Sequence, residues 1–325
     1  MQNLIVTFNI VAPFLLYMLF GALMKRAGYI TDDFHAKLNK LVSSTILPIF
    51  NFYNLIKADL SALKEGGYIV YVLVGQIVML AVYALLVHLL KRSPARAGAM
   101  VDTMFVNNTM VFGCAIALAM YGEGNFAPML LVAAILLPLY NGLVIPVIQI
   151  YGSKQAALDQ SEDGQSVKVS TGKLLLDVLK NPLVIAVFCG LIYQFSGIEF
   201  PEFAMTFLSG LSATLTPLIF IILGAGFTFK GFMEDRKDLI LCLLIKLVIA
   251  PAIMIILPLK FGYRDTVLIA CLLAFASPSG VTTASVVKSC GCDERFAGEM
   301  VALSSGLSIL SLFLWIFLFK TLGLV

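Results

Sequence analysis

The sequence has little charge and few of the side chains that enzymes most often use. Only 13% of its 325 residues are charged, and it contains two histidines and one tryptophan. By contrast 60% of the residues are hydrophobic, whereas a soluble domain has about 45–50% apolar and 25% charged residues. We therefore expect an integral membrane protein. The net charge of +3 also leaves no strongly basic surface of the kind that binds nucleic acid.

Motifs for catalysis, nucleotide binding and metal binding are absent as well. The sequence has no Ser-His-Asp constellation, no pair of carboxylates inside an apolar segment, and no Walker or dinucleotide fingerprint. Cys290 and Cys292 form a close pair, but no histidine or second cysteine pair lies nearby to complete four metal ligands. We expect no enzyme activity, no cofactor, no bound metal and no transport powered directly by ATP.

Apolar segments of about 20 residues, each long enough to cross roughly 30 Å of hydrocarbon, follow one another along the chain. These segments lie at residues 5–24, 41–60, 68–90, 98–121, 127–150, 179–197, 204–229, 239–259, 265–289 and 298–320. The fold class that they predict is an all-α membrane protein with ten transmembrane helices. Because the number is even, both chain termini would lie on the same side of the membrane.

Basic residues fall mainly on one side of these segments. The connections on that side carry Lys25, Arg26, Lys37, Lys40, Lys91, Arg92, Arg96, Lys154, Lys168, Lys173, Lys180, Lys230, Arg236, Lys237, Lys288 and Arg295. The opposite side carries Lys57, Lys64, Lys260, Arg264 and Lys320. Lysine and arginine collect in cytoplasmic loops. We therefore expect a multi-pass protein of the cell membrane whose two termini are extracytoplasmic.

The two halves of the chain correspond to each other at a shift of 169 residues. The matched pairs are Pro13 and Pro182, Gly21 and Gly190, Gly28 and Gly197, Ser43 and Ser212, Thr45 and Thr214, Pro48 and Pro217, and Gly122 and Gly291. Only roughly one such proline or glycine match is expected by chance, which favours an internal duplication. We expect five-helix repeats over 1–151 and 179–325, joined by a cytoplasmic linker over 152–178. Because five is odd, the repeats are predicted to be inverted.

Polar residues interrupt the fourth apolar segment of each half, at Val106-Asn107-Asn108-Thr109 and at Ala276-Ser277-Pro278-Ser279-Gly280. Irregular backbone at membrane depth occurs where protein or a water-filled cavity satisfies its polar groups, so paired breaks indicate a solute site near the midplane. In one alternative the asparagines only link helices by hydrogen bonds, and in another the proline only kinks its helix. The predicted substrate-binding residues in the breaks are Asn107, Asn108, Thr109, Ser277, Pro278, Ser279 and Gly280.

Residues outside the two breaks are also candidates for the site. Lys246 is the only basic residue well inside an apolar segment. Its side chain either extends toward the cytoplasm or faces the cavity. We expect Lys246 to contact Asp102, and both residues to have a role in coupling or gating. Asn141 places an amide in the fifth segment and is a further candidate for substrate binding. The residues expected to shape the helices around the cavity are Gly113, Pro48 and Pro217.

Motifs along the chain resemble those of a known family in their order and spacing. The motifs are Asn107-Asn108-Thr109-Met110-Val111-Phe112-Gly113 followed by Ala119-Met120-Tyr121-Gly122, then Lys180-Asn181-Pro182-Leu183, Pro217-Leu218 with Gly224-Ala225, Lys246-Leu247-Val248 with Pro251, and Pro278-Ser279-Gly280-Val281. They resemble helices 4, 6, 7, 8 and 9 of the auxin efflux carrier family, which includes plant PIN proteins and prokaryotic organic-acid permeases. The chain departs from the family at Asn107 and Ala115, where plant members have prolines, which leaves open whether helix 4 is fully broken.

The resemblance implies a fold, a function and partners. In the family, helices 1, 2, 6 and 7 form a scaffold, helices 3–5 and 8–10 form a moving transport domain, and helices 4 and 9 cross where they are unwound. Members carry organic anions, and the carboxylate is received by an asparagine, a role that we carry to Asn108 with Asn107 beside it. We therefore expect a homodimeric secondary transporter of a small organic anion in the lipid bilayer, working by elevator-type alternating access. Coupling to H⁺, to Na⁺ or to neither stays open, as do a sodium symporter of the bile-acid type and a channel or receptor.

Overall fold

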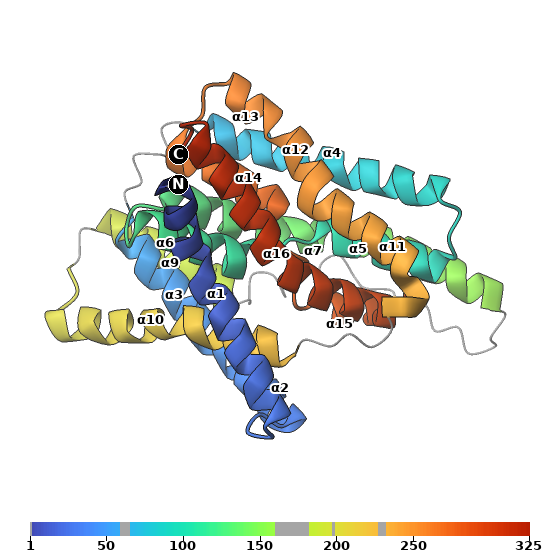
Figure 1. The fold of residues 1–325 in the computed structure, drawn as a ribbon, viewed down its shortest axis with the longest axis horizontal. Coiled ribbons are helices and arrows are strands. Elements are labelled where there is room, and N and C mark those ends of the chain that lie inside the picture. Colours follow the sequence, from blue (N-terminus) through green and yellow to red (C-terminus); the bar gives the residue numbers. More distant parts are fainter. Residues whose placement is uncertain (1, 59–65, 160–181, 197–198, 227–231) are drawn as a thin grey trace.

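A computed structural model describes residues 2–58, 66–159, 182–196, 199–226 and 232–325. In these ranges the regular secondary structure is helical, apart from one isolated antiparallel β-bridge between Asn107 and Ser279 (Figure 1). The two ends of the chain lie side by side, because the Asn3 side-chain amide donates a hydrogen bond to the Lys320 carbonyl at 3.1 Å. The predicted all-helical class is confirmed.

The helices of the first half come in the order expected from the apolar segments. They are α1 (Gln2–Arg26), α2 (Asp32–Leu41), the π-helical turn η1 (Val42–Ile46), α3 (Leu47–Ile56), α4 (Gly67–Leu89), α5 (Pro94–Phe105), the π-helical turn η3 (Thr109–Gly113), α6 (Cys114–Tyr121) and α7 (Ala127–Asp159). The second half contains α9 (Pro182–Ser196), α10 (Glu202–Ala225), α11 (Phe232–Leu244), the π-helical turn η4 (Ile245–Ile249), α12 (Ala250–Met254), α13 (Ile256–Lys260), α14 (Asp265–Ala276), α15 (Thr283–Ser289) and α16 (Glu294–Thr321).

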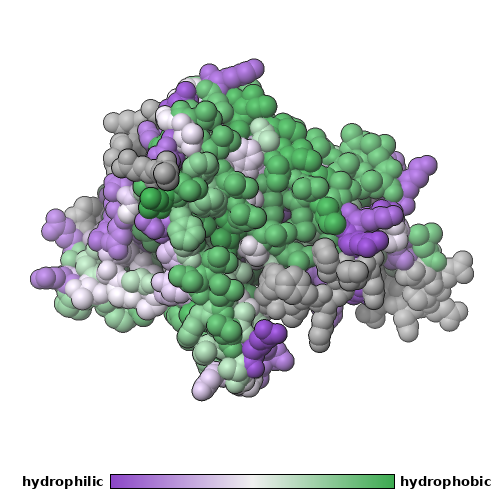
Figure 2. Space-filling model, viewed as in Figure 1, coloured by the Kyte–Doolittle hydropathy of each residue, from purple (hydrophilic) through white to green (hydrophobic). Residues whose placement is uncertain are grey.

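Within the described residues, six helical stretches are long and apolar enough to cross a membrane. They are Asn3–Arg26, Gly67–Leu89, Ala127–Leu158, Glu202–Ala225, Asp235–Lys260 and Glu294–Thr321. Hydrophobic side chains cover the middle of the face seen in Figure 2, while hydrophilic ones gather toward its edges. This distribution fits a protein whose outer surface meets lipid. Two further apolar helices, Thr109–Tyr121 and Asp265–Ala276, are shorter.

The short helices α5 and α14 occupy the interior. Each has 12 residues, which at 1.5 Å per residue span about 18 Å and cannot cross the hydrocarbon alone. Nearly every side chain of both is buried, and α7 packs against both of them. After its first residue α14 is apolar on nearly every side, which is typical of an interior helix, and α5 buries Asp102 and Thr103 along with its apolar residues. The pair therefore ends inside the protein, where the chain breaks before α6 and α15.

Two helix pairs pack closely through glycine. α1 packs on α10, where a Cβ on Gly21 or Gly224 would lie 2.0 or 1.9 Å from a backbone oxygen of the facing helix, so only glycine fits. α3 packs on α9, where Gly190 faces the side chain of Leu55. The 169-residue shift places Gly21 on Gly190 and Leu55 on Gly224. The two helix contacts therefore use corresponding positions in the two halves of the chain.

Prolines set the shape of the helix that runs from α11 to α13. Pro251 has no N–H to offer to the Leu247 carbonyl, and the indole of Trp315 donates a hydrogen bond to that oxygen instead, at 3.1 Å. Pro258 frees the Met254 carbonyl in the same way, and the Tyr71 hydroxyl donates to it. Neighbouring helices therefore satisfy the two carbonyls that the prolines leave over. The π-helical turn η4, which carries Lys246, lies directly before the first of these prolines.

The structure shows where the last helix of the first half ends and where the two predicted bending prolines lie. α7 continues to Asp159, past the expected start of the linker at residue 152. Within it, Gly152 packs against the turn after α15, where a Cβ would lie 1.7 Å from the Cys290 carbonyl oxygen. Residues 160–178 of the predicted linker lie outside the described residues. Pro48 follows the π-helical turn η1, and Pro217 lies inside α10.

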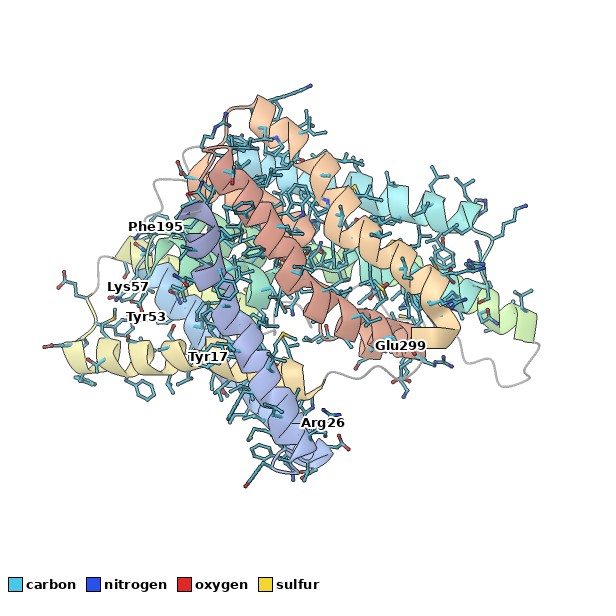
Figure 3. All side chains as sticks on the ribbon, in the orientation of Figure 1. Tyr17, Arg26, Tyr53, Lys57, Phe195 and Glu299 are labelled. Atoms are coloured by element: carbon cyan, nitrogen blue, oxygen red, sulfur yellow. The ribbon has the colours of Figure 1, made fainter. Side chains whose placement is uncertain are left out.

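The end of α3 is tied to the turn after α6. Tyr53 and Lys57, labelled in Figure 3, both contact Glu123: the Tyr53 hydroxyl and the Lys57 Nζ each lie 3.1 Å from its carboxylate. Because these groups are partly exposed, the contact contributes little stability, on the order of 1 kcal/mol. It nevertheless joins a helix that the resemblance assigns to the scaffold to one that it assigns to the transport domain.

Candidate functional site

The two broken segments cross each other inside the protein. The backbone N–H of Asn108 donates to the Pro278 carbonyl at 2.8 Å, and the N–H of Gly280 donates to the Val106 carbonyl at 3.1 Å. This pair of bonds forms the isolated β-bridge centred on Asn107 and Ser279. Each break thus satisfies backbone groups of the other, which irregular backbone inside a membrane requires. The first break is complete although it lacks the prolines of plant members of the family.

The serines of the second break face the protein interior. Ser277 donates its hydroxyl to the Leu273 carbonyl at 2.6 Å, and Ser279 donates its hydroxyl to the Thr103 carbonyl at 2.7 Å. The N–H of Ser279 donates to the hydroxyl of Ser304 on α16 at 3.0 Å. All three serines are buried. The structure thus uses Ser277 and Ser279 to hold the crossing together, and their polar atoms have partners within the chain.

Lys246 lies behind the first break, with no exposed surface. Its ammonium group donates to the Met104 carbonyl at 3.0 Å, to the Val106 carbonyl at 3.1 Å and to Oδ1 of Asn107 at 2.9 Å. These three bonds use all the donors that a lysine has. The last carbonyls of a helix have no intrahelical partner and carry its partial negative charge. Lys246 therefore caps the C-terminal end of α5.

The expected direct contact between Lys246 and Asp102 is replaced by this cap. Asp102 is fully buried, and its polar surroundings are the Thr283 hydroxyl and the charge of Lys246. Neither carboxyl oxygen accepts a hydrogen bond from the described part of the chain. The carbonyls that the helix break leaves over are the nearer acceptors, and they take up the lysine donors.

The two asparagines of the first break have different surroundings. Asn107 accepts from Lys246, and its amide nitrogen donates to the Phe105 carbonyl at 3.1 Å, so both ends of its side chain are occupied. Asn108 is 7% exposed, and within the described residues its amide nitrogen has no hydrogen-bond partner. A buried N–H group without a partner costs free energy. Asn108 is therefore the asparagine with a donor available for a ligand.

A cavity of about 150 Å³ adjoins Asn108. Tyr140 of α7 also lines it, close to Asn107 and Thr109, and the Tyr140 hydroxyl is buried with no partner among the described residues. Phe105 holds the tyrosine ring edge to face, with ring centroids 5.3 Å apart. The other lining residues are Ser43, Leu47, Val106, Asn107, Thr109, Met110, Val111, Ala133, Leu137, Ile219, Gly280, Val281 and Thr282.

The start of the helical segment Thr109–Tyr121 also faces this cavity. Thr109, Met110 and Val111 line it, and the first N–H groups of a helix have no intrahelical acceptor. The N-terminal end of a helix carries roughly half a positive charge. Gly113, within this first turn, packs so closely on Met129 that a Cβ would lie 2.5 Å from the methionine methyl group. The cavity therefore gathers donors and partial positive charge at one end, and apolar side chains elsewhere.

A scan against models of protein families matches residues 6–316 to the family described as Membrane transport protein. The chain belongs to this family. It is the family of auxin efflux carriers and PIN-like transporters, so the resemblance found in the motifs is confirmed. Membership establishes a multi-pass membrane transporter, and the family is one of transporters and not of enzymes. A search of curated proteins finds no match to the chain.

Within this transporter, a second buried side chain acts as Lys246 does. Gln76 of α4 is 1% exposed, and its amide nitrogen donates to the Ala274 carbonyl at 2.9 Å. Ala274 lies in the last turn of α14, the half-helix that ends at the second break. Gln76 therefore occupies a carbonyl at the C-terminal end of α14. Sequence reasoning missed Gln76, because a single amide in an apolar helix gives no indication of the direction in which it points.

Tyr140 was missed for a similar reason. The sequence predicts the neighbouring Asn141 as a substrate-binding residue, because an amide is unusual in an apolar segment. Tyrosine is common at membrane interfaces and in packing, so Tyr140 gave no such indication. The side chain of Asn141 lies outside the described residues. The signal in the sequence that could have indicated Tyr140 is its place directly before Asn141, in the motif Leu137-Pro138-Leu139-Tyr140-Asn141-Gly142.

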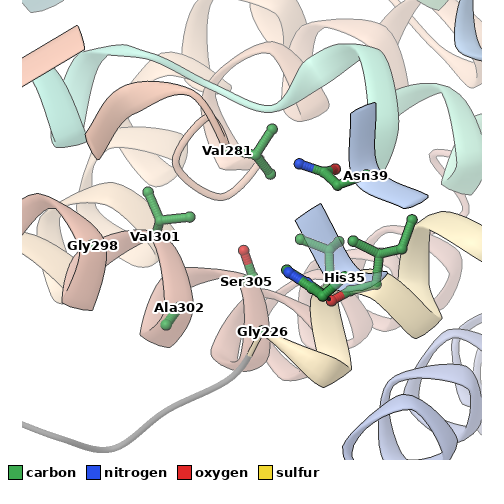
Figure 4. A pocket seen from close by; sticks show the side chains of 10 residues that line it. His35, Asn39, Gly226, Val281, Gly298, Val301, Ala302 and Ser305 are labelled. Atoms are coloured by element: carbon green, nitrogen blue, oxygen red, sulfur yellow. Dashed lines mark hydrogen bonds between the residues drawn. The ribbon is translucent and has the colours of Figure 1, made fainter. Parts of the chain in front are cut away.

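Figure 4 shows a second cavity, which has a volume of about 180 Å³. His35 and Asn39 of α2 line it on one side, and Ser305 of α16 lines it on the other. A ring nitrogen of His35 lies 2.9 Å from the Ile222 carbonyl oxygen, and the Ser305 hydroxyl has no partner in the described ranges. Val281 of the second break lines both cavities. The backbone at Val281 therefore lies between a mainly apolar cavity and a more polar one.

Proposed function

We propose that the chain is a secondary transporter that moves a small organic carboxylate across the cell membrane by elevator-type alternating access. The observation that carries this proposal is the pair of buried donors at the cavity, the Asn108 amide and the Tyr140 hydroxyl, which have no partner within the described residues. Unpaired buried donors are costly unless a ligand accepts from them. A carboxylate offers two acceptor oxygens that suit two such donors.

The electrostatics of the cavity favour an anion over a cation. Among the described residues that line it, none has a carboxylate side chain. The start of the Thr109–Tyr121 helix supplies partial positive charge and free N–H groups, an arrangement that binds anions. The Lys246 ammonium lies behind the wall formed by Val106 and Asn107. Asn108, Thr109 and Tyr140 would therefore receive the carboxylate, and the apolar wall would hold the rest of the ligand.

The size of the cavity favours a small ligand. Its volume of about 150 Å³ is below the 300–1,000 Å³ typical of sites for drug-sized molecules. Most of the lining residues away from the donors are apolar, among them Leu47, Val111, Leu137 and Ile219. We therefore favour a short aliphatic acid as substrate.

Corresponding helices support the proposed inverted repeat of ten transmembrane helices. The 169-residue shift places α4 on the α11 to α13 stretch, α5 on α14, α6 on α15 and α7 on α16. The same shift places α2 to α3 on α10, and it relates the α1–α10 contact to the α9–α3 contact. Because lysine and arginine collect in cytoplasmic loops, we propose that both chain termini lie outside the cell.

The position of the cavity supports an elevator mechanism. Ser43, Leu47 and Ile219 line it from helices assigned to the scaffold, and the crossing segments and α7 line it from helices assigned to the transport domain. A ligand held at such a boundary is carried when one body slides along the other. The second cavity, which meets the first at Val281, lies along the same boundary between α2, α10 and α16.

Thermal stabilisation of the purified protein tests the proposal. The panel is acetate, butyrate, benzoate, malonate and malate, each with its uncharged amide, and a ligand at 100 times Kd should add about 2.7 kcal/mol of stability. We expect stabilisation by at least one carboxylate, and its loss in Asn108→Ala. The matched control is Asn125→Ala, which alters an exposed asparagine whose amide contacts the Tyr121 carbonyl. No stabilisation by any carboxylate, with the protein folded, would reject a carboxylate substrate.

Counterflow in liposomes distinguishes a carrier from a channel or a receptor. Unlabelled substrate on one side of a membrane accelerates the movement of labelled substrate from the other side only when a carrier exchanges them. We expect such acceleration, and imposed Na⁺ or H⁺ gradients in the same assay would identify a coupling ion. Flux without acceleration would indicate a channel.

A further inference from the structure

We propose that Gln76 and Lys246 are a matched pair of positioning residues that hold the C-terminal ends of the two half-helices, and that the charge on Lys246 gives the cavity its preference for an anion over a neutral ligand. This inference rests on the proposed function, because it concerns the specificity of the same cavity. It assigns different roles to two residues whose places in the two halves of the chain differ by one position at the 169-residue shift.

Sequence position identifies the pair. The residue 169 positions before Lys246 is Ile77, the neighbour of Gln76. Gln76 lies on α4 and Lys246 on η4, which occupy corresponding places in the two halves. Each of these side chains contacts the half-helix of the opposite half of the chain: Gln76 contacts α14 and Lys246 contacts α5. The two contacts are therefore exchanged between the halves.

The carbonyls that they contact correspond as well. Lys246 donates to the Met104 carbonyl, and the residue 169 positions after Met104 is Leu273, the neighbour of Ala274, to which Gln76 donates. A helix that stops inside the membrane exposes carbonyls that neither lipid nor an adjoining turn satisfies. A side-chain donor at each end removes that cost, which explains why both α4 and the α11 to α13 helix carry a polar residue at this depth.

The two donors differ in charge. The Gln76 amide is neutral, and it satisfies one carbonyl. The Lys246 side chain ends in a titratable amine, and this group contacts Val106 and Asn107, which both line the cavity. The titratable groups near Lys246 are the Asp102 carboxyl and the thiol of Cys242. Because Asp102 accepts no hydrogen bond from Lys246, the ammonium is directed to the half-helix end and the cavity wall.

This arrangement has a measurable consequence for specificity. A unit charge roughly 10 Å from a carboxylate, at an effective dielectric constant of about 20, changes its affinity by about tenfold and leaves that of an uncharged ligand unchanged. The probes are butyrate with butyramide and malonate with malonamide. We expect Lys246→Gln, which keeps an amide donor, to lower the carboxylate-to-amide affinity ratio about tenfold. Gln76→Ala should weaken acid and amide alike and keep the ratio.

The decisive experiment moves the positively charged side chain from position 246 to position 76. In Gln76→Lys alone, a second cation at the crossing should raise the carboxylate-to-amide ratio about tenfold, and this variant leaves Lys246 in place. In the exchanged variant Gln76→Lys with Lys246→Gln, we expect the ratio to return toward the wild-type value. Size-exclusion profiles and thermal unfolding verify that each variant is folded.

The outcomes separate this inference from the proposed function. If the wild-type protein binds no carboxylate of the panel, both fail, and if it binds another member than butyrate or malonate, that acid and its amide serve as the probes. If it binds a carboxylate but Lys246→Gln or Gln76→Lys leaves the ratio unchanged, the inference fails and the proposed function stands. A folded Lys246→Gln that loses acid and amide in equal measure would make Lys246 a structural cap only, which also overturns the inference.

Discussion

The two breaks that cross in this transporter have the same backbone role and different side chains. The first break presents Asn108 and the start of the Thr109–Tyr121 helix to a cavity, and a buried lysine supports it from behind. In the second break, Ser277 and Ser279 direct their hydroxyls into the protein, and a neutral glutamine supports the adjoining half-helix. One break therefore offers donors to a ligand, while the other mainly closes the structure. If the halves arose by duplication, divergence has left the unpaired amide donor on one side of the crossing.

The largest effect is expected from removing the charged support. Lys246→Met leaves the carbonyls of Met104 and Val106 and the Asn107 Oδ1 without this donor. Because each buried acceptor that loses its partner costs about 1–3 kcal/mol, we expect the free energy of unfolding to fall by about 3 kcal/mol or more. Equilibrium unfolding in mixed micelles measures it. Lys260→Met, an exposed lysine at the end of the same apolar stretch, should change stability by less than about 0.5 kcal/mol.

A smaller effect is expected from removing the neutral support. Gln76→Leu leaves only the Ala274 carbonyl without its side-chain donor, so the free energy of unfolding should fall by about 1–2 kcal/mol. The same unfolding experiment in mixed micelles gives the value. A loss as large as that of Lys246→Met would mean that the two halves depend equally on their caps and that the charge has no additional structural role.

The smallest effect concerns the ligand rather than the fold. Tyr140→Phe removes one hydroxyl donor from the cavity, and we expect about a fivefold weaker affinity for the carboxylate, because one hydrogen bond contributes about 1 kcal/mol. Titration of the purified protein with the best carboxylate of the panel measures it. Tyr121→Phe is the matched control, since Tyr121 ends the same broken segment and does not line the cavity. Equal effects of the two changes would argue against a contact between Tyr140 and the ligand.

Much of this organisation could be predicted from the sequence. Asparagines in one apolar segment, and serine, proline and glycine in another, marked both breaks, because such residues disfavour a continuous helix at membrane depth. The family was predicted from the same motifs and is confirmed. The depth of Lys246 was also evident. Its partners were not, because the acceptors are backbone carbonyls that exist only once α5 has ended.

The different contacts of adjacent residues could not be predicted from the sequence. Asn107 and Asn108 are adjacent in sequence, yet one contacts Lys246 and the other lines the cavity with an unpaired donor. The direction of each depends on the β-bridge between the two breaks, which joins residues far apart in the chain. Gln76 and Tyr140 were missed because they lie in helices that are apolar on every side, where periodicity does not reveal which face meets a cavity.

The most direct test of the account is exchange of labelled carboxylate in liposomes that contain either the wild-type protein or Asn108→Asp. The substitution keeps the size of the side chain but replaces an available donor with a charge that repels an anion. We expect saturable exchange that unlabelled carboxylate accelerates in the wild type, and a rate at least about a hundredfold lower in the variant, corresponding to about 2.7 kcal/mol. Exchange at the wild-type rate in a folded Asn108→Asp protein would contradict the assignment of the crossing cavity as the carboxylate site.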